Sequence, residues 1–171
     1  MKYTTTPISG LFVAHTNKIA DERGSFMRLF CDDELNFKLP IKQINFSYTA
    51  QKGTVRGMHY QKEPADESKI ARCIEGAIYD VAVDLRENSP TYLQHFAVEL
   101  SAENNLALII PAGCAHGFQA LTDNCKMVYL HTAAYTPAHE AGARFDDPKL
   151  AISWPLKPIN LSERDLTFKP L

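Results

Sequence analysis

Short stretches in which polar and apolar residues alternate recur along most of this chain, and they constrain its fold more than any other feature. Residues 41–49 alternate throughout, which predicts a β-strand with one apolar face and one polar face that could line a cavity. Residues 69–74 and 77–85 predict two strands joined by a tight turn at Glu75 and Gly76. Further strands are expected over residues 94–100, 106–110, 117–121 and 126–133. Short strands at regular spacing predict an all-β jelly-roll fold, a β-sandwich or barrel.

Helical patterns are rare in this sequence. Residues 32–37 and the tail around residues 161–165 are the segments with helical character. In the tail, Ser162 precedes Asp165 by three residues, which is the spacing of a capping box at the start of a helix. We therefore expect short helices at the periphery of the β-fold.

Length, composition and charge limit the function classes that are open to the chain. With 171 residues and 45% hydrophobic content, it is long enough for one well-buried core and short for two, which predicts a single domain over residues 1–171. The formal net charge is −2, from 18 basic and 20 acidic side chains, and no basic run is present. This charge pattern lacks the electrostatic footprint of a nucleic-acid-binding protein, so we expect no nucleic-acid partner.

The cysteines and the apolar segments indicate the cellular setting. The chain has four cysteines and no CxxC pair, and a protein of this size does not need disulfides, so a reduced, cytoplasmic location is expected. Residues 1–7 contain no apolar signal core, and no window approaches the ~20 apolar residues that span a membrane. The sequence therefore predicts a soluble protein with no membrane partner.

Two histidines and a lysine outline a candidate active site. His59 lies in the stretch RGMHYQ over residues 56–61, Lys69 opens a later predicted strand, and His116 lies in the Pro/Gly-rich stretch PAGCAHGF over residues 111–118. Inside a β-barrel these groups can converge. An imidazole can then take a proton from a bound substrate, and an ammonium group can stabilise the negative charge that remains.

Each of these residues also has a purely structural interpretation. A lone histidine such as His59 is more often a hydrogen-bonded structural residue than a base, and His116 could serve only to hold its own turn. Tyr129, aligned in period 2 with Met127 and His131, could be a core aromatic residue. The cysteines fit small buried hydrophobic residues better than nucleophiles. The local patterns alone leave the function open.

A metal site is the first alternative that the sequence tests. Metal-binding jelly-roll barrels often use a His-x-His pair with a carboxylate and a later histidine. His116 resembles that later histidine, but the positions two residues from His59 hold Gly57 and Gln61. A transition metal would be under-coordinated by such a set, so we predict no metal site.

A family resemblance covers nearly the whole chain. It rests on ordered blocks: DERG over residues 21–24, RGMHYQ over 56–61, Lys69 with Arg72, DVAVDLR over 80–86 with SPT over 89–91, VELSAEN over 98–104, IPAG over 110–113 with AHGF over 115–118, Tyr129, Tyr135, DDP over 146–148, ISWP over 152–155 and LSERD over 161–165. With these blocks the chain resembles the dTDP-4-dehydrorhamnose 3,5-epimerases, nucleotide-sugar isomerases of the metal-free cupin type. The resemblance implies a cupin-like jelly roll and no cofactor.

The resemblance also implies a reaction and a role for each residue in it. In a 4-keto-6-deoxyhexose, the hydrogens beside the ketone are acidic, because the resulting anion delocalises onto the carbonyl oxygen. His59 matches the family's base, and Asp165 matches the carboxylate that orients it. Lys69 would hold the enolate oxygen, and Tyr129 would return a proton to the opposite face. Asp80 and His116 would support these groups or contact the sugar.

For the nucleotide, the family suggests arginines for the diphosphate and aromatic residues for the base. The matching residues here are Arg23, Phe26, Gln43, Asn45, Arg56 and Tyr135. The family commonly forms homodimers in which N-terminal strands cross to the partner, so we expect a homodimer that shares its sites. This arrangement would explain how Phe26 and Gln43 serve a site centred on His59.

Departures from the family pattern leave alternatives open. Arg28 stands where many members carry Glu, and Leu130 replaces the lysine that often follows the acid tyrosine. The substrate could then be another nucleoside-diphosphate 4-keto sugar, or inversion could stop at one carbon. A 3,4-ketoisomerase, a metal-dependent cupin oxygenase and a non-catalytic sugar-binding module are the remaining rivals.

Overall fold

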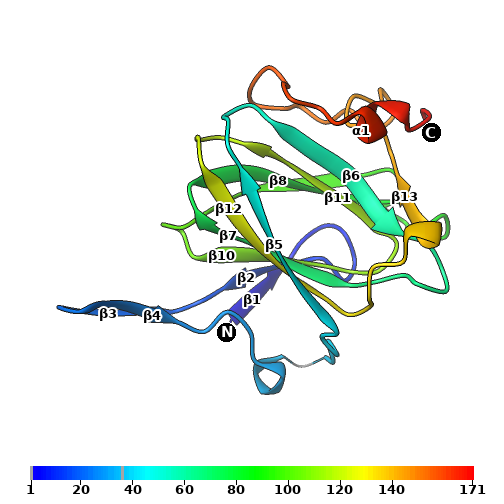
Figure 1. The fold of residues 1–171 in the computed structure, drawn as a ribbon. Coiled ribbons are helices and arrows are strands. Elements are labelled where there is room, and N and C mark those ends of the chain that lie inside the picture. The colour runs from blue at the N-terminus through cyan, green and yellow to red at the C-terminus, as the bar shows by residue number, and fades with distance from the viewer. Residues whose placement is uncertain (1, 36) are drawn as a thin grey trace.

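Two antiparallel β-sheets face each other in the computed structural model, which describes residues 2–35 and 37–171 (Figure 1). The larger sheet has six strands in the order β1 (Lys2–Thr5), β2 (Phe12–His15), β10 (Leu106–Ile110), β7 (Lys69–Glu75), β12 (Cys125–His131) and β5 (Gln43–Thr49). The smaller has five strands in the order β13 (Glu140–Gly142), β6 (Val55–Gln61), β11 (Cys114–Ala120), β8 (Ala77–Asp84) and β9 (His95–Ser101). This architecture confirms the predicted all-β jelly roll.

The strand predictions hold, and the turn between two of the predicted strands connects the two sheets. The segments predicted as strands around residues 41–49, 69–74, 77–85, 94–100, 106–110, 117–121 and 126–133 all form strands. The predicted tight turn at Glu75 and Gly76 is present, and it joins strands of different sheets: β7 pairs with β10 and β12, whereas β8 pairs with β9 and β11. Gly76 has φ +77° between them, and a Cβ there would lie 2.5 Å from Thr122 Oγ1. The chain thus crosses from one sheet to the other at Gly76.

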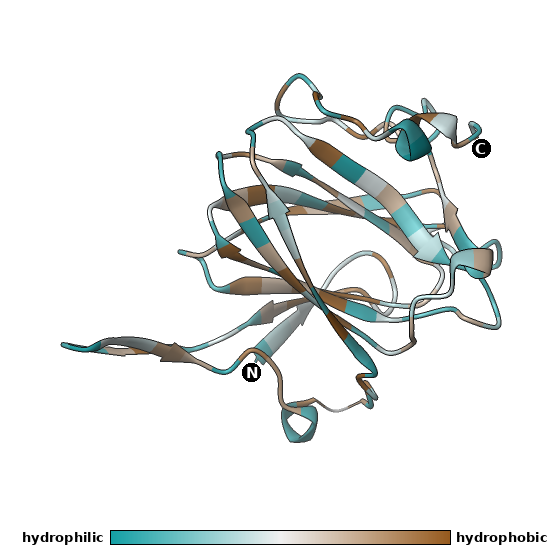
Figure 2. Ribbon diagram, in the orientation of Figure 1, coloured by the Kyte–Doolittle hydropathy of each residue, from teal (hydrophilic) through white to brown (hydrophobic). Residues whose placement is uncertain are grey.

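The largest core cluster takes its side chains from apolar positions on strands of both sheets. Figure 2 shows hydrophobic and hydrophilic residues alternating along several of these strands. The fully buried side chains of the cluster include Ile78, Leu100, Leu108, Phe118 and Met127. Burial of a large apolar side chain of this kind stabilises the fold by about 1.5–3 kcal/mol. These residues fill one part of the space between the sheets, and polar side chains line the cavity in the other part.

Inward-facing positions change from apolar to polar along β7 and β12. On β7, Ala71 belongs to the core and Lys69, two residues away on the same face, lines a cavity. On β12, Met127 belongs to the core, whereas Tyr129 and His131 line the same cavity. The strand period therefore places the functional groups directly beside the hydrophobic core.

Strands β6 and β11 approach each other closely at Gly57 and Gly117. A Cβ on Gly57 would lie 2.5 Å from Gly117 Cα, and Gly57 also has φ +131°, which favours glycine. A Cβ on Gly117 would lie 2.7 Å from the Arg56 carbonyl oxygen. The two glycines permit a contact in which His59 and His116 become direct cross-strand neighbours.

Helices are few and short, as expected, although their bounds differ from the prediction. Among the described residues of the segment predicted over 32–37, Asp32–Glu34 form a 3₁₀ turn, which ends where Leu35 adopts extended backbone angles. Asn36 and Met1 lie outside the described residues. A second 3₁₀ turn, Pro137–His139, begins with proline. In the tail, α1 (Glu163–Thr167) begins after Ser162, whose Oγ accepts a hydrogen bond from the Asp165 backbone N–H at 3.1 Å.

A separate hairpin projects from the body of the sandwich. Strands β3 (Lys18–Asp21) and β4 (Gly24–Met27) form a two-stranded sheet that extends away from both larger sheets (Figure 1). Its apolar side chains Ile19 and Phe26 are each 68% exposed. Within the described part of the chain, no helix has the length and apolarity needed to cross a bilayer.

Candidate active site

A cavity of about 870 Å³ opens into the interior of the sandwich beside the core. Both sheets and the C-terminal segment contribute to its wall. The predicted site residues that line it are Asn45, Arg56, His59, Lys69, His116, Tyr129, Tyr135 and Asp165. The fold therefore brings together residues that lie more than 100 positions apart in the sequence.

His59 and Asp165 form a short hydrogen-bonded pair in this cavity. His59 Nε2 lies 2.6 Å from Asp165 Oδ1, and the Gly57 backbone N–H donates to Asp165 Oδ2 at 3.2 Å. Asp165 is 2% exposed. Burial alone would raise the pKa of this carboxyl, but the hydrogen bonds from His59 and the Gly57 N–H lower the pKa to about 2. Asp165 is thus a carboxylate at neutral pH, and its side chain does more than cap the helix.

The carboxylate determines the tautomer of His59. Arg164 Nη2 also lies 3.1 Å from His59 Nε2, but a guanidinium only donates hydrogen bonds, so Nε2 cannot serve both neighbours at once. We assign the Nε2 proton to the shorter contact, with Asp165 as the acceptor. Nδ1 is then the ring nitrogen that can accept a proton. Phe168 packs edge-on against the same ring, with centroids 5.9 Å apart.

His116 is held by a second buried carboxylate. Its Nε2 lies 2.7 Å from Asp80 Oδ1, and Asp80 is fully buried. The prediction that placed His116 in a turn was wrong, because β11 begins at Cys114 and includes it. Asp80 lies behind His116 and outside the cavity wall, and its Oδ2 has no hydrogen-bond partner among the described residues. Asp80 is therefore placed to support His116 rather than to contact the sugar.

Tyr129 lies in the wall formed by the larger sheet, whereas His59 comes from the smaller sheet. Its hydroxyl is 3.2 Å from Ser47 Oγ, and its ring meets the His116 ring with centroids 6.1 Å apart. Burial strongly raises the pKa of the phenol. The hydroxyl consequently stays protonated at neutral pH and can donate a proton.

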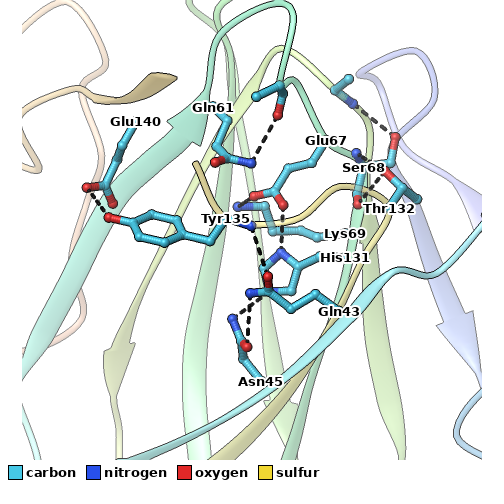
Figure 3. Close-up of polar contacts among 12 residues, drawn as sticks. Gln43, Asn45, Gln61, Glu67, Ser68, Lys69, His131, Thr132, Tyr135 and Glu140 are labelled. Atoms are coloured by element: carbon cyan, nitrogen blue, oxygen red, sulfur yellow. Dashed lines mark hydrogen bonds and ion pairs between the residues drawn. The ribbon is translucent and has the colours of Figure 1, made fainter. Parts of the chain in front are cut away.

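Lys69 lies in the same wall and pairs with Glu67, an acid that no sequence pattern indicated. Its Nζ is 3.2 Å from Glu67 Oε1, and Glu67 Oε2 is 2.8 Å from His131 Nδ1 (Figure 3). Each of these three residues is at most 9% exposed. His131 shares the period-2 face of Tyr129, a signal that could have identified it, whereas Glu67 lies in a loop without periodicity.

The cavity mouth carries the residues expected to bind a nucleotide. Arg56 donates from Nε to Thr49 Oγ1 at 3.1 Å and from Nη2 to the Tyr48 carbonyl oxygen at 3.0 Å, and the residue is exposed. Tyr135 is half exposed, and its hydroxyl donates to Glu140 Oε2 at 3.0 Å. Gln43 is outside the lining, but its side chain bonds both Asn45 and the Tyr135 backbone N–H. Arg164 also bonds Glu140, so these two further residues, both missed from the sequence, close one side of the mouth.

Arg23 and Phe26 lie away from this cavity. Both are on the projecting β3–β4 hairpin, where the Arg23 side chain is 84% exposed and pairs with Asp21. The structure therefore does not bring them to the site of their own chain. Leu130, which departs from the family pattern, packs with Ile70 and Ala107 on the face turned away from the cavity.

The described residues contain no group of three or more His, Cys, Asp or Glu side chains arranged to hold a metal ion. The four cysteines, Cys31, Cys73, Cys114 and Cys125, are free thiols, and all but Cys31 are buried. Burial raises the pKa of the Cys73 and Cys114 thiols to about 12, as expected for core residues rather than nucleophiles.

Comparison with known proteins assigns the family. Residues 5–171 match the family model described as dTDP-4-dehydrorhamnose 3,5-epimerase. The protein of that name from Methanothermobacter thermautotrophicus is 39% identical over 99% of this chain and 94% of its own length. The crystal structure of a dTDP-6-deoxy-D-glucose-3,5-epimerase from Legionella pneumophila, in complex with dTDP-4-keto-L-rhamnose, superposes with a TM-score of 0.93 at 37% identity, covering 99% of this chain and 92% of that one.

A second similar structure has a narrower activity in its name. It is a 3′-monoepimerase from Streptomyces bikiniensis in complex with dTDP-quinovose, with a TM-score of 0.90 and 33% identity over 96% of this chain and 85% of that one. The family model spans nearly the entire sequence, and the relatives match over almost their full length. The chain therefore belongs to the dTDP-4-dehydrorhamnose 3,5-epimerase family of isomerases.

Proposed function

We propose that this chain inverts carbons 3 and 5 of a dTDP-4-keto-6-deoxyhexose in dTDP-rhamnose-type biosynthesis. The observation that carries the proposal is the 2.6 Å pair of His59 and Asp165, which shares one cavity with Lys69 and a protonated Tyr129. This set supplies a base, a cation for an enolate oxygen and an acid. An epimerisation beside a ketone needs these three groups and no redox step.

Each inversion begins with removal of a proton from a carbon beside the ketone. His59 Nδ1 takes that proton, and the electron pair of the C–H bond moves into an enolate whose charge rests on the carbonyl oxygen. Asp165 stabilises the resulting imidazolium, and Lys69 stabilises the enolate oxygen. A positioned acid or base of this kind typically contributes ~10²–10⁴-fold to the rate.

The second half of each inversion returns a proton to the other face of the same carbon. Tyr129 lies in the opposite wall from His59 and donates its phenolic proton as the enolate collapses to the ketone. His59 is then protonated and Tyr129 is deprotonated. A proton transfer through solvent restores both groups before the next inversion.

The nucleotide would lie at the mouth, against Arg56, Asn45, Gln43 and Tyr135, with Arg23 and Phe26 supplied by a second copy in a homodimer. Two observations support this sharing. The β3–β4 hairpin projects beyond its own sandwich, and the edge strand β5 presents Ile44, Phe46 and Tyr48 to solvent, at 66%, 61% and 47% exposure. An edge strand with an exposed apolar face favours association.

Incubation with dTDP-4-keto-6-deoxyglucose in deuterated water tests the reaction. We expect proton NMR signals at carbons 3 and 5 to disappear together with formation of the doubly inverted sugar. Exchange at one carbon alone would indicate a single-carbon epimerase, an activity that the Streptomyces bikiniensis relative carries in its name. Migration of the carbonyl would identify a ketoisomerase, and binding without exchange would identify a sugar-binding module.

A parallel incubation with EDTA addresses the oxygenase alternative. We expect the rate to be unchanged, because no step of the proposed mechanism uses a metal. Loss of activity that iron restores would contradict the proposal.

A further inference from the structure

Two buried residues in the wall of the candidate active site have no role in the proposed mechanism. They are Glu67 and His131, which contact each other and, through Glu67, contact Lys69. Lys69 and His131 are direct partners across β7 and β12. Glu67 and His131 are both titratable and at most 9% exposed, and they lie close to Lys69, the proposed cation for the enolate. Burial of titratable groups at this position suggests a functional role.

A chain of hydrogen bonds fixes the protonation of His131, and its direction is set at one end by the backbone (Figure 3). The Tyr135 N–H can only donate, and it donates to Gln43 Oε1 at 2.9 Å. Gln43 Nε2 therefore donates to Asn45 Oδ1 at 3.1 Å. Asn45 Nδ2 is then the donor toward His131 Nε2 at 3.3 Å, so that this ring nitrogen must accept.

The proton of the neutral His131 ring is consequently on Nδ1, where it is donated to Glu67 Oε2 at 2.8 Å. A second proton on Nε2 would face the Asn45 amide donor. If the Asn45 and Gln43 amides turned over to accept this proton, the Gln43 NH₂ group would face the Tyr135 N–H, and two donors would oppose each other. The chain thus favours a neutral His131, which leaves Lys69 as the cation that faces Glu67.

The charge on Glu67 complements that cation. Burial alone would raise the pKa of the Glu67 carboxyl, but the His131 hydrogen bond and the Lys69 charge lower it. Glu67 therefore supplies a buried counter-charge 3.2 Å from the Lys69 Nζ, in a place that solvent does not reach. Among the described residues, the Lys69 ammonium group has one ion-pair partner, Glu67. Its other N–H groups therefore remain available to a substrate oxygen.

Neighbouring contacts hold the Glu67 loop in place without a substrate. Gln61 Nε2 donates to the Ala65 carbonyl oxygen at 3.0 Å, and Gln61 Oε1 accepts from the Thr136 N–H at 2.6 Å. The Ser68 N–H donates to Thr132 Oγ1 at 2.9 Å. Hydrogen bonds on both sides of Glu67 therefore connect the loop before β7 to the segment after β12.

We propose that Glu67 and His131 are positioning residues that orient Lys69 for the enolate oxygen and pair its charge, with Gln43 and Asn45 fixing the His131 tautomer. The inference rests on the proposed function, because it assigns Lys69 to the enolate. It also links the two ends of the site: the hydrogen-bond chain begins at Tyr135, at the nucleotide end, and finishes at the ammonium group that serves the chemical step.

The Glu67→Gln variant tests this role, because it removes the charge and keeps the shape. We expect kcat for epimerisation and the rate of deuterium exchange to fall about 10²-fold, similar to the loss of one enolate-stabilising group, with KM and dTDP affinity little changed. Glu75→Gln is the matched control. Glu75 is an exposed carboxylate at the far end of β7, the strand that follows the Glu67 loop, and it pairs with Lys126 at 2.6 Å, so its loss should leave kcat unchanged.

Substitutions at His131 provide a second variant pair. His131→Gln offers one donor and one acceptor, as a neutral imidazole does, whereas His131→Leu offers neither. We expect turnover in the glutamine variant to exceed that in the leucine variant by about 10-fold at similar KM, in line with a lost charge-supporting hydrogen bond. Equal turnover in the two variants would contradict the positioning role.

The tautomer of His131 is measurable without any substrate. In protein labelled with ¹⁵N-histidine at pH 8, we expect the His131 resonances, identified by their loss in His131→Gln, to show a protonated Nδ1 and an unprotonated Nε2. A protonated Nε2 would contradict the proposed direction of the hydrogen bonds from Tyr135 to His131. An active wild-type protein with an equally active Glu67→Gln variant would overturn the role of Glu67 alone, whereas an inactive wild type would contradict the proposed function itself.

Discussion

His59 and His116 are direct neighbours across β6 and β11, and each is hydrogen-bonded to its own buried carboxylate, Asp165 for His59 and Asp80 for His116. The two pairs differ in exposure: the His59 side chain is 25% exposed, whereas the His116 side chain is 6% exposed. Only His59 therefore combines a fixed tautomer with ready access from the cavity. This difference underlies its assignment as the base.

Replacement of Asp165 by asparagine should impair turnover more than binding. The amide cannot stabilise the imidazolium that forms when His59 takes a proton, so we expect kcat to fall by about 10²–10⁴-fold with a small change in KM. Steady-state kinetics with a 4-keto sugar nucleotide provide the measurement, and His59→Ala serves as the reference for complete loss of exchange. A raised KM at unchanged kcat would show that the tail acts only in binding.

Removal of the Tyr129 hydroxyl should uncouple exchange from inversion. In Tyr129→Phe, His59 still removes a proton and returns a deuteron from its own side, so labelled starting material should accumulate with little inverted product. The phenyl ring keeps the packing against His116 nearly unchanged. The ratio of deuterium incorporation to epimer formation is the decisive quantity. If both decline equally, another group supplies the proton.

The depressed pKa of Asp165 predicts a specific loss of stability in acid. The pKa of the Asp165 carboxyl is about 2 in the folded protein, compared with 3.8 for an unperturbed Asp. The carboxylate therefore stabilises the fold fully above pH 3.8, and this contribution is lost as the pH falls toward 2. The shift corresponds to about 2 kcal/mol. We expect Asp165→Asn to be less stable than wild type by roughly that amount at pH 5 and by much less near pH 2. Denaturant unfolding at both pH values measures the difference; a gap that does not narrow in acid would contradict the assignment.

Mixing two inactive variants should restore activity if the hairpin serves the partner's site. In a heterodimer of Arg23→Ala and His59→Ala chains, one site carries both defects and the other carries neither. Random association of equal amounts should therefore yield about a quarter of wild-type activity. The unmixed variants provide the baseline, and their exchange during mixing can be followed with a tagged chain. Failure of the mixture to exceed the baseline would place Arg23 outside the partner's site.

The sequence predicted the strands well because alternation within a strand is a local property. The pairing of His59 with Asp165 is not local, since 106 positions separate them, and it came from the family resemblance rather than from spacing. Glu67 was missed for the same reason: its loop has no periodicity, and its partners become visible only when β7 and β12 are paired. The tight turn at Gly76 was predicted, but the sequence could not show that it connects different sheets, because a turn within one sheet has the same local signal.

The apolar-to-polar change along β12 makes folding and chemistry depend on the same alignment. Tyr129 and His131 face the cavity because Met127 faces the core, and Val128 and Leu130 face the other way. A slip of one residue would carry Val128 and Leu130 into the cavity and withdraw the phenol and the imidazole together. Any version of this strand that packs correctly against the core therefore presents its reactive groups correctly as well, and a misregistered strand fails in both respects at once.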